Sequence, residues 1–169
     1  MEDHRPLCTS LLAKIHEQFE RTGHLIELLP ADRLDWAPTI PDTWPLGVLL
    51  GHLLDCAAGF CAALAAFEPR RLAHFAQLRE LPVNHRCSPT ETAGRMAIYQ
   101  RHIEDGFALL TDVDLGRRLS TVFVKQGETL LTPLLGNLEH LINHKHQLFT
   151  YLKLLGVEVT SRDLYHFRG

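Results

Sequence analysis

The sequence of 169 residues has no uninterrupted apolar run that approaches the roughly 18 residues needed to cross a bilayer, so we expect no membrane-spanning helix. It has no cluster of basic residues, and its formal net charge is -3 with neutral histidines. Because binding to nucleic acid or to anionic lipid depends on positive charge, we expect neither partner. No basic segment followed by a long apolar core opens the chain, so a secretory signal is not expected either.

The cysteines are few and unpaired in sequence, since Cys8, Cys56, Cys61 and Cys87 form no Cys-x-x-Cys motif. We therefore expect free thiols in a reducing compartment, which predicts a cytoplasmic protein. Apolar residues make up 46% of the chain and charged residues 22%, as in ordinary globular domains. The length is sufficient for one core, so we predict a single domain over residues 1–169.

Histidine is the residue that the chain has in excess, with 11 copies. His140 and His144 lie four residues apart in the stretch LEHLINHKHQLFTYLKLLG. At about 100° per residue, the two imidazoles are only about 40° apart around a helix and leave the same side of it. Both histidines lie at one edge of an apolar stripe formed by Leu141, Ile142, Leu148, Phe149, Leu152 and Leu155. The pair is therefore predicted at the edge of a buried helix face.

Apolar residues recur at three- and four-residue steps in four stretches, which predicts four long helices. Each predicted helix begins at a proline, a residue favoured at the first helical position. The predicted ranges are 6–29, 45–67, 89–110 and 133–155. These helices predict an all-α protein, a four-helix bundle with one long crossover connection and a short extra helix near residues 71–80.

The predicted helix ends carry specific signals. Ser88 and Glu91 have the spacing of a capping box, and Gly156 is placed to close the last helix. Residues 111–132 lose the helical period, so we expect a short hairpin or an extended loop there, with Gly127 in the turn. The residues after Gly156 are too few for another packed element, but Leu164, Tyr165 and Phe167 are placed to lie across the bundle.

His52 occupies the edge of the apolar stripe of the second predicted helix, as His140 and His144 do on the last one. Sites in helical bundles are built from side chains on facing helices. Three neutral imidazoles leave a divalent ion its full charge and an open coordination position. Such an ion lowers the pKa of a coordinated water or thiol. His52, His140 and His144 are therefore the predicted metal ligands, and no catalytic residue is predicted.

Other residues near these positions have two interpretations. Cys56, one turn after His52, is either a small buried residue or a group that approaches the ion. Asp55 is either an outer partner of His52 or the carboxylate of a two-histidine, one-carboxylate site. Trp36 and Trp44 either cover the end of the core or form a binding platform. On the first helix, we expect His16 and His24 to face solvent or the helix end without a partner group.

The motif LLGHLLD in the second helix and HLINHKHQLFTYLKLLG at the end resemble the DinB/YfiT-like superfamily of small helical-bundle metalloproteins. The resemblance includes the Trp- and Pro-rich segment before the second helix, so it covers most of the chain. In that family a His of the second helix and a His-x-x-x-His pair of the last helix bind a divalent metal. These positions correspond to His52, His140 and His144.

The family pattern commonly continues with Arg-Gly-Gln after the final ligand, where this chain has Lys145, His146 and Gln147. Gln147 matches and Lys145 is similar, whereas His146 replaces a glycine. We expect His146 on the surface and not as a fourth ligand.

The resemblance implies a divalent metal cofactor, and we expect zinc or nickel. Three imidazoles also suit iron and copper. Some relatives are thiol-dependent transferases or isomerases that use bacillithiol or mycothiol, and many have no assigned reaction. We therefore expect a metal-dependent enzyme, a thiol S-transferase or a hydrolase-like enzyme, that acts on a small-molecule substrate with a low-molecular-weight thiol.

Two other classes of function stay open. The chain is alternatively a non-catalytic, stress-related metal-binding bundle, or an interaction module in which the three histidines are coincidental. A homodimer is expected because relatives often pair and because the alanine-rich second helix offers a flat contact surface.

Overall fold

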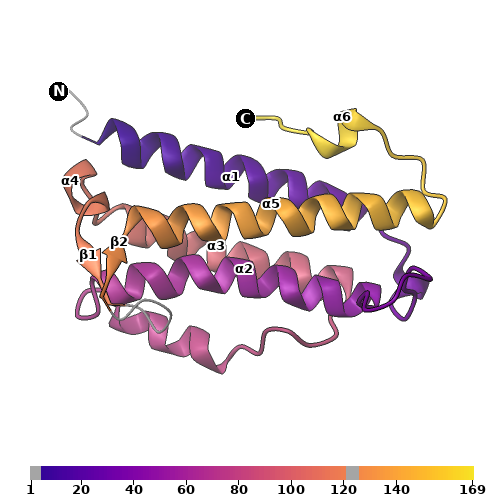
Figure 1. Cartoon of the computed structure of the whole chain (residues 1–169), viewed down its shortest axis with the longest axis horizontal. Coiled ribbons are helices and arrows are strands. Elements are labelled where there is room, and N and C mark those ends of the chain that lie inside the picture. The colour runs from indigo at the N-terminus through magenta and orange to yellow at the C-terminus, as the bar shows by residue number, and fades with distance from the viewer. Residues whose placement is uncertain (1–4, 121–125) are drawn as a thin grey trace.

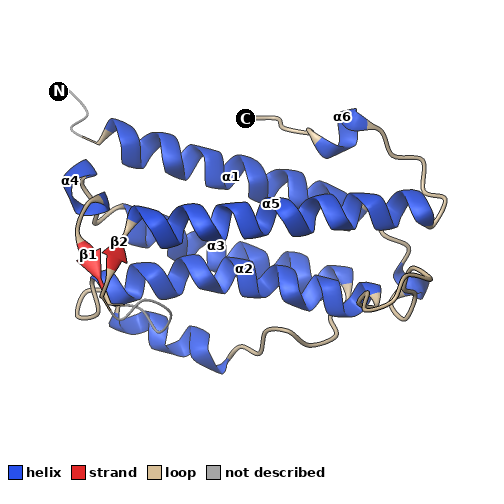
Figure 2. Cartoon of the chain, viewed as in Figure 1, coloured by secondary structure: helices blue, strands red, loops and turns tan. Residues whose placement is uncertain are grey.

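The computed structural model describes residues 5–120 and 126–169. Four long helices form the all-α bundle that the sequence predicts (Figures 1 and 2). They are α1 (Pro6–Glu27), α2 (Leu46–Phe67), α3 (Pro89–Phe107) and α5 (Leu131–Leu154). The shorter elements are η1 (Ala31–Arg33), η2 (Ala73–Glu80), α4 (Asp112–Leu115), β1 (Arg118–Leu119), β2 (Glu128–Thr129) and α6 (Ser161–Leu164).

The helices form a closed ring of neighbours. Both α1 and α2 pack against α3 and α5, so α1 and α2 occupy opposite corners of the bundle. In Figure 1, α2 and α3 run in the same direction, and α1 and α5 run in the opposite one. Residues 68–88 therefore return along the length of the bundle between α2 and α3. This connection, which contains η2, is the predicted long crossover with its short extra helix.

The core is centred on α2, most of whose residues are buried. By length and composition alone α2 is apolar enough to cross a membrane, with a mean hydropathy of 1.8. However, 61% of that window is buried inside the bundle, as expected of a central core helix. Ala58, Ala62, Ala65 and Ala66 face a cavity beneath η2, whereas Ala57 and Ala63 are buried in the core, and α2 and η2 contact each other. The alanine-rich face expected to form a dimer contact is therefore partly covered by the chain itself.

The helix boundaries follow the predicted caps closely at α3 and less closely at α5. The Ser88 hydroxyl accepts a hydrogen bond from the Glu91 amide at 3.1 Å, and Pro89 is the first helical residue. Helix α5 begins at Leu131, two residues before the predicted start at Pro133. A proline is tolerated there because the first amides of a helix have no intrahelical acceptor.

The segment expected to be a hairpin or loop contains an extra helical turn, α4. In its capping box, the Thr111 backbone amide donates to an Asp114 carboxylate oxygen at 2.8 Å. A helix of this length is too short to show a periodic apolar stripe in the sequence. The predicted hairpin is present as β1 and β2, an antiparallel pair. Gly127 has a φ of +79° next to β2, a conformation that glycine adopts readily. Residues 121–125 of the predicted hairpin lie outside the described residues.

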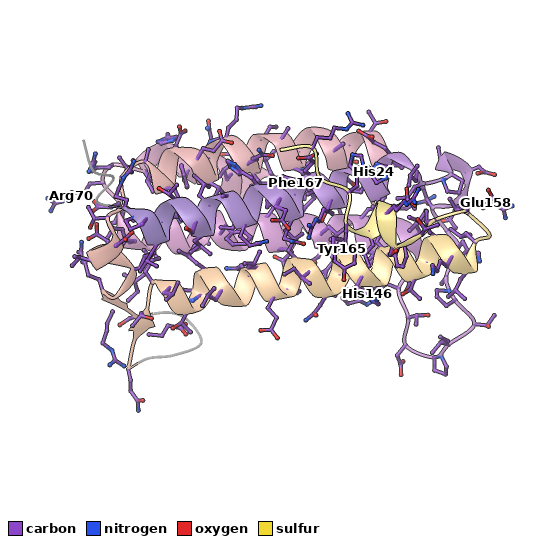
Figure 3. All side chains as sticks on the ribbon, turned by 90° about the horizontal axis from the view of Figure 1, so that it is seen from above. His24, Arg70, His146, Glu158, Tyr165 and Phe167 are labelled. Atoms are coloured by element: carbon purple, nitrogen blue, oxygen red, sulfur yellow. The ribbon has the colours of Figure 1, made fainter. Side chains whose placement is uncertain are left out.

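The prediction of no packed element after Gly156 is wrong. Gly156 does end α5, with a φ of +81°, but the chain then forms α6, which packs against α1. A capping box between Thr160 and Asp163 nucleates this single turn, and Leu164 is buried beneath it. In Figure 3 the C-terminal segment crosses over the bundle near His24.

The prediction that His16 and His24 lack partners is also wrong. His24 Nε2 lies 3.2 Å from an Asp163 carboxylate oxygen, and its ring stacks on His166 at a centroid distance of 4.0 Å. His16 Nε2 lies 3.1 Å from a Glu104 carboxylate oxygen. Both partners come from distant elements, so the helix pattern of α1 contains no sign of them.

Candidate metal centre

Helices α2 and α5 bring the three predicted ligands to one place. At Gly59 the surface of α2 lies directly against α5, because a Cβ at that position would meet the Asn137 side chain. The centroid of the His52 ring is 4.9 Å from that of His140 and 4.5 Å from that of His144. His140 and His144 are 4.7 Å apart by the same measure. The structure thus joins residues that are 88 positions apart in sequence.

The nitrogen atoms of the three rings converge as ligands of one ion would. Nε2 of His52 and Nε2 of His140 are 2.9 Å apart, and one ring nitrogen from each histidine lies within 4.8 Å of the others. Two nitrogens bound to one ion at about 2.1 Å are separated by roughly 3.0–3.4 Å for angles between 90° and 109°. The observed spacing is close to that range, so the three side chains fit a divalent metal.

Amide oxygens fix which nitrogen of two rings is free. Nδ1 of His52 is 2.5 Å from Asn84 Oδ1, and Nδ1 of His144 is 2.9 Å from Gln147 Oε1. An amide oxygen only accepts, so each Nδ1 carries the proton and each Nε2 presents its lone pair. Outer partners of this kind orient histidine ligands in metal sites.

The partner of His144 is itself held in place. The Gln147 amide nitrogen donates to the Tyr151 hydroxyl at 3.2 Å, and that hydroxyl donates to the Trp44 carbonyl at 3.1 Å. This chain of hydrogen bonds ties α5 to the segment that precedes α2. It fixes the Gln147 oxygen, and through it the tautomer of His144.

Asn84 reaches His52 because the crossover connection lies directly on α2. A Cβ at Gly51 would lie 1.7 Å from the His85 carbonyl oxygen, so only glycine permits this contact. The backbone amide of Asn84 donates to the backbone carbonyl of Gly51 at 3.2 Å. Asn84 has a φ of +56°, a left-handed conformation that asparagine tolerates better than most residues.

The electrostatic environment favours neutral imidazoles. The pKa of His140 is lowered below its usual value, mainly by partial burial and to a smaller extent by the neighbouring His52. Burial also lowers the pKa of His144, although the hydrogen bond to Gln147 opposes the change. Both rings are therefore unprotonated near pH 7, which is the form that binds a metal.

Trp44 borders the three histidines. Its ring stacks on His144 at a centroid distance of 5.7 Å and meets His52 edge-on at 4.5 Å. Trp36 instead packs edge-on against Tyr151 at 5.5 Å. Trp36 therefore has the predicted covering role, whereas Trp44 forms a wall of the candidate site and is 38% exposed.

Asp55 and Cys56 both lie away from the converging nitrogens. A carboxylate oxygen of Asp55 is 3.9 Å from Nδ1 of His52, on the side of the ring that faces Asn84. Asp55 is thus placed as an outer partner of His52. Cys56 is fully buried, and its thiol lies 3.6 Å from the His52 carbonyl oxygen on its own helix. Burial raises the pKa of the Cys56 thiol to about 12.

The two residues after His144 take different environments. His146 is exposed, as expected, and Figure 3 shows it on the outside of α5. Lys145 points inward and donates to Gln18 Oε1 at 2.8 Å. Burial lowers the pKa of the Lys145 ammonium group to about 8.

The two amide partners of the ligands, Asn84 and Gln147, were not predicted from the sequence, whereas Asp55 was. Gln147 follows His144 by three residues, so helical spacing could have identified it. Asn84 lies 32 residues from His52 in an irregular connection, and no local pattern joins the two.

A comparison with protein-family models finds a match to the DinB superfamily over residues 14–153. The chain belongs to the DinB superfamily. The resemblance stated from the sequence motifs is therefore confirmed. No curated protein matches the chain.

Two solved structures resemble this DinB-superfamily protein along nearly its whole length. One is the DinB-like protein YjoA of Bacillus subtilis, with a TM-score of 0.67 and 17% identity, covering 89% of this chain and 94% of that one. The other is a DinB family member of Exiguobacterium sibiricum, with a TM-score of 0.60 and 21% identity, covering 94% and 97%. At these identities the likeness shows the fold alone, and it agrees with the all-α prediction.

Proposed function

We propose that this protein binds one divalent metal ion through His52, His140 and His144, and that the ion, zinc or nickel, serves an enzymatic reaction. The observation that carries the proposal is the convergence of the three rings, with Nδ1 of two of them turned to amide oxygens. A structural role for the histidines alone would not require these lone pairs to point at a common position.

The reaction class that we propose is S-transfer from a low-molecular-weight thiol to a small electrophilic substrate. A bound ion would lower the pKa of a coordinating thiol and so supply a thiolate near neutral pH. Asn84 and Gln147 hold the rings of His52 and His144 in place. Trp44 forms an apolar wall beside these two histidines.

The cysteines of the chain support an external thiol. All four are buried, and burial is the main cause of their raised pKa values. The pKa is about 11 for Cys8 and Cys87 and about 12 for Cys56 and Cys61. Without a metal to ionise it, a thiol with such a pKa is a poor nucleophile at pH 7. A cosubstrate is therefore the expected source of the reactive sulfur.

A second candidate function, a metal-binding bundle without catalysis, is favoured by the position of the cavities. One cavity of about 500 Å³ lies between α2 and η2, and another of about 580 Å³ lies between α1, α3 and the C-terminal residues. Neither is lined by His52, His140 or His144. A substrate of the three-histidine centre would thus bind outside both of these cavities, beside Trp44.

The experiment compares wild type with His140→Ala and with His146→Ala, an exposed control on the same helix. Each protein is loaded with zinc or nickel and assayed with bacillithiol or mycothiol and chlorodinitrobenzene, whose chloride the sulfur displaces. We expect conjugation by wild type and His146→Ala, and loss of it in His140→Ala or after chelation. Metal binding without conjugation by any thiol would favour the non-catalytic bundle. Conjugation that survives chelation would contradict the proposed mechanism.

Homodimer formation and cytoplasmic localisation stay predictions. The dimer is checked by light scattering of the purified protein. A single species at the monomer mass of 19.2 kDa would contradict it.

A further inference from the structure

A second group of potential ligands lies where the crossover connection enters α3. It consists of His85, Cys87 and Glu91, whose ligand atoms all lie within 4.8 Å of one another. Nε2 of His85 is 3.2 Å from the Cys87 sulfur and 3.0 Å from a Glu91 carboxylate oxygen. None of these residues takes part in the three-histidine centre.

The backbone around these residues is fixed on both sides. The Cys87 amide donates to the Gly47 carbonyl of α2 at 2.9 Å, and the Cys87 side chain is 1% exposed. Glu91 lies in the first turn of α3, where the Ser88 cap holds its amide. The fold thus fixes the backbone that carries these side chains, with Cys87 buried and the His85 and Glu91 side chains 33% and 41% exposed.

His85 Nε2 faces two groups of the metal-ligand type at once. The Cys87 sulfur and a Glu91 carboxylate oxygen both lie within 3.2 Å of that nitrogen. A metal ion satisfies all three groups at once. Ligands at about 2.0–2.3 Å in tetrahedral geometry are roughly 3.3–3.6 Å apart, so small side-chain shifts admit an ion.

We propose that His85, Cys87 and Glu91 form a second divalent-metal site that suits zinc. Imidazole, thiolate and carboxylate are all zinc ligands, and three of them leave a fourth position for water. Binding would release the Cys87 proton to solvent, because a thiol that coordinates zinc is deprotonated.

Arg95 limits the strength of this site. Its Nη1 atom is 3.5 Å from both His85 Nε2 and a Glu91 carboxylate oxygen, and its Nη2 atom donates to the Pro82 carbonyl. The guanidinium charge repels a cation, but the thiolate and the carboxylate together supply two negative charges. The site therefore favours a metal that binds sulfur strongly over magnesium or calcium.

The His85, Cys87 and Glu91 site lies next to a residue that positions a ligand of the three-histidine centre. Asn84, which holds Nδ1 of His52, directly precedes His85. An ion on His85, Cys87 and Glu91 would fasten the connection to α3 and so restrict the position of Asn84. We therefore expect a structural site that supports the three-histidine centre.

Cobalt(II) distinguishes the two sites in the full-length protein, because thiolate ligands give a near-ultraviolet charge-transfer band and imidazoles do not. We expect wild type to bind two cobalt ions per chain and to show this band. Cys87→Ser should lose the band and retain one ion. The triple variant His52→Ala, His140→Ala, His144→Ala should retain the band and one ion.

Cys61→Ser is the matched control, since Cys61 is equally buried but its thiol faces the Tyr99 carbonyl at 3.7 Å. It should keep the band. Glu91→Gln changes an exposed side chain without changing its shape and should weaken binding at this site alone. Wild type without the band, or a band that survives Cys87→Ser, would overturn the second site whatever the three histidines do.

Discussion

Single side chains decide whether two of the three imidazoles present lone pairs or protons to a common point. His52 and His144 each donate from Nδ1 to an amide oxygen, from Asn84 and Gln147 respectively. These amides do not touch the proposed ion. They act by holding the rings, which is the usual role of outer partners in metal sites.

Replacement of Gln147 by methionine tests this role. The substitution keeps an unbranched side chain but removes the acceptor for His144 Nδ1, so the ring gains freedom to rotate and to change tautomer. We expect zinc affinity to fall about 10- to 100-fold. Calorimetric titration of the purified protein with zinc measures the change.

Asn143→Ala is the matched control, because Asn143 is exposed on the same helix. It should bind zinc as wild type does. Equal affinities for the Gln147→Met variant and wild type would show that the hydrogen bond to His144 has no part in the site.

The residues of the site differ in how far the sequence alone reveals them. His140 and His144 follow from helical spacing, and His52 from its matching place at the edge of an apolar stripe. Asn84 and Trp44 do not, because their contacts with the histidines depend on how the connections fold over α2. Which ion the histidines hold is likewise absent from the residue pattern, since imidazole suits several metals.

Among the elements, the crossover connection approaches the backbone of the bundle closely at one point. It lies on α2 at Gly51, where the His85 carbonyl leaves no space for a side chain. This contact positions both Asn84 for the first site and His85 for the second.

Gly51→Ala should therefore displace the connection. We expect a loss of about 1–3 kcal/mol in the free energy of unfolding, which is typical of an overpacked site. Urea unfolding followed by circular dichroism gives the value. Gly94→Ala in α3 is the control, because a Cβ there meets nothing within 4 Å. It should be neutral or stabilising by up to about 1 kcal/mol. Equal effects of the two substitutions would contradict the contact.

The C-terminal element depends on Asp163. Its carboxylate accepts from the Thr160 amide and lies beside His24, and these contacts lower the pKa of Asp163 to about 2. A carboxyl group with a lowered folded-state pKa stabilises the protein fully above its unfolded pKa of 3.8. That contribution is lost as the pH falls toward 2.

Asp163→Asn should thus be less stable than wild type at pH 7, and the difference should close between pH 4 and pH 2. Urea unfolding at several pH values measures it. Hydrogen exchange should also become faster in residues 157–169. A difference that stays constant across this range would show that the Asp163 charge does not hold α6.

Across the whole molecule, the bundle is the part that the sequence determines best. The prolines and periodic stripes locate four helices, and the long crossover follows from their spacing. The one-turn helices α4 and α6 were not predicted, because each rests on a capping box and not on a periodic stripe. The contacts of α6 with α1 join segments that are far apart in the sequence, so no local pattern reveals them.

Metal binding should stabilise the whole bundle, because it links α2 to α5. An ion at 100 times its dissociation constant adds about 2.7 kcal/mol, which raises the melting temperature by roughly 5–10 °C in a domain of this size. Scanning calorimetry on the Cys87→Ser variant isolates the three-histidine contribution. The same variant with His140→Ala added should show no rise, and a rise in both would place the ion elsewhere.

The most direct test is an anomalous-difference map from crystals of the zinc-loaded protein. We expect a zinc peak about 2.1 Å from one ring nitrogen of each of His52, His140 and His144. A map with no peak between these three rings, at full zinc saturation, would show that the histidines do not bind the ion.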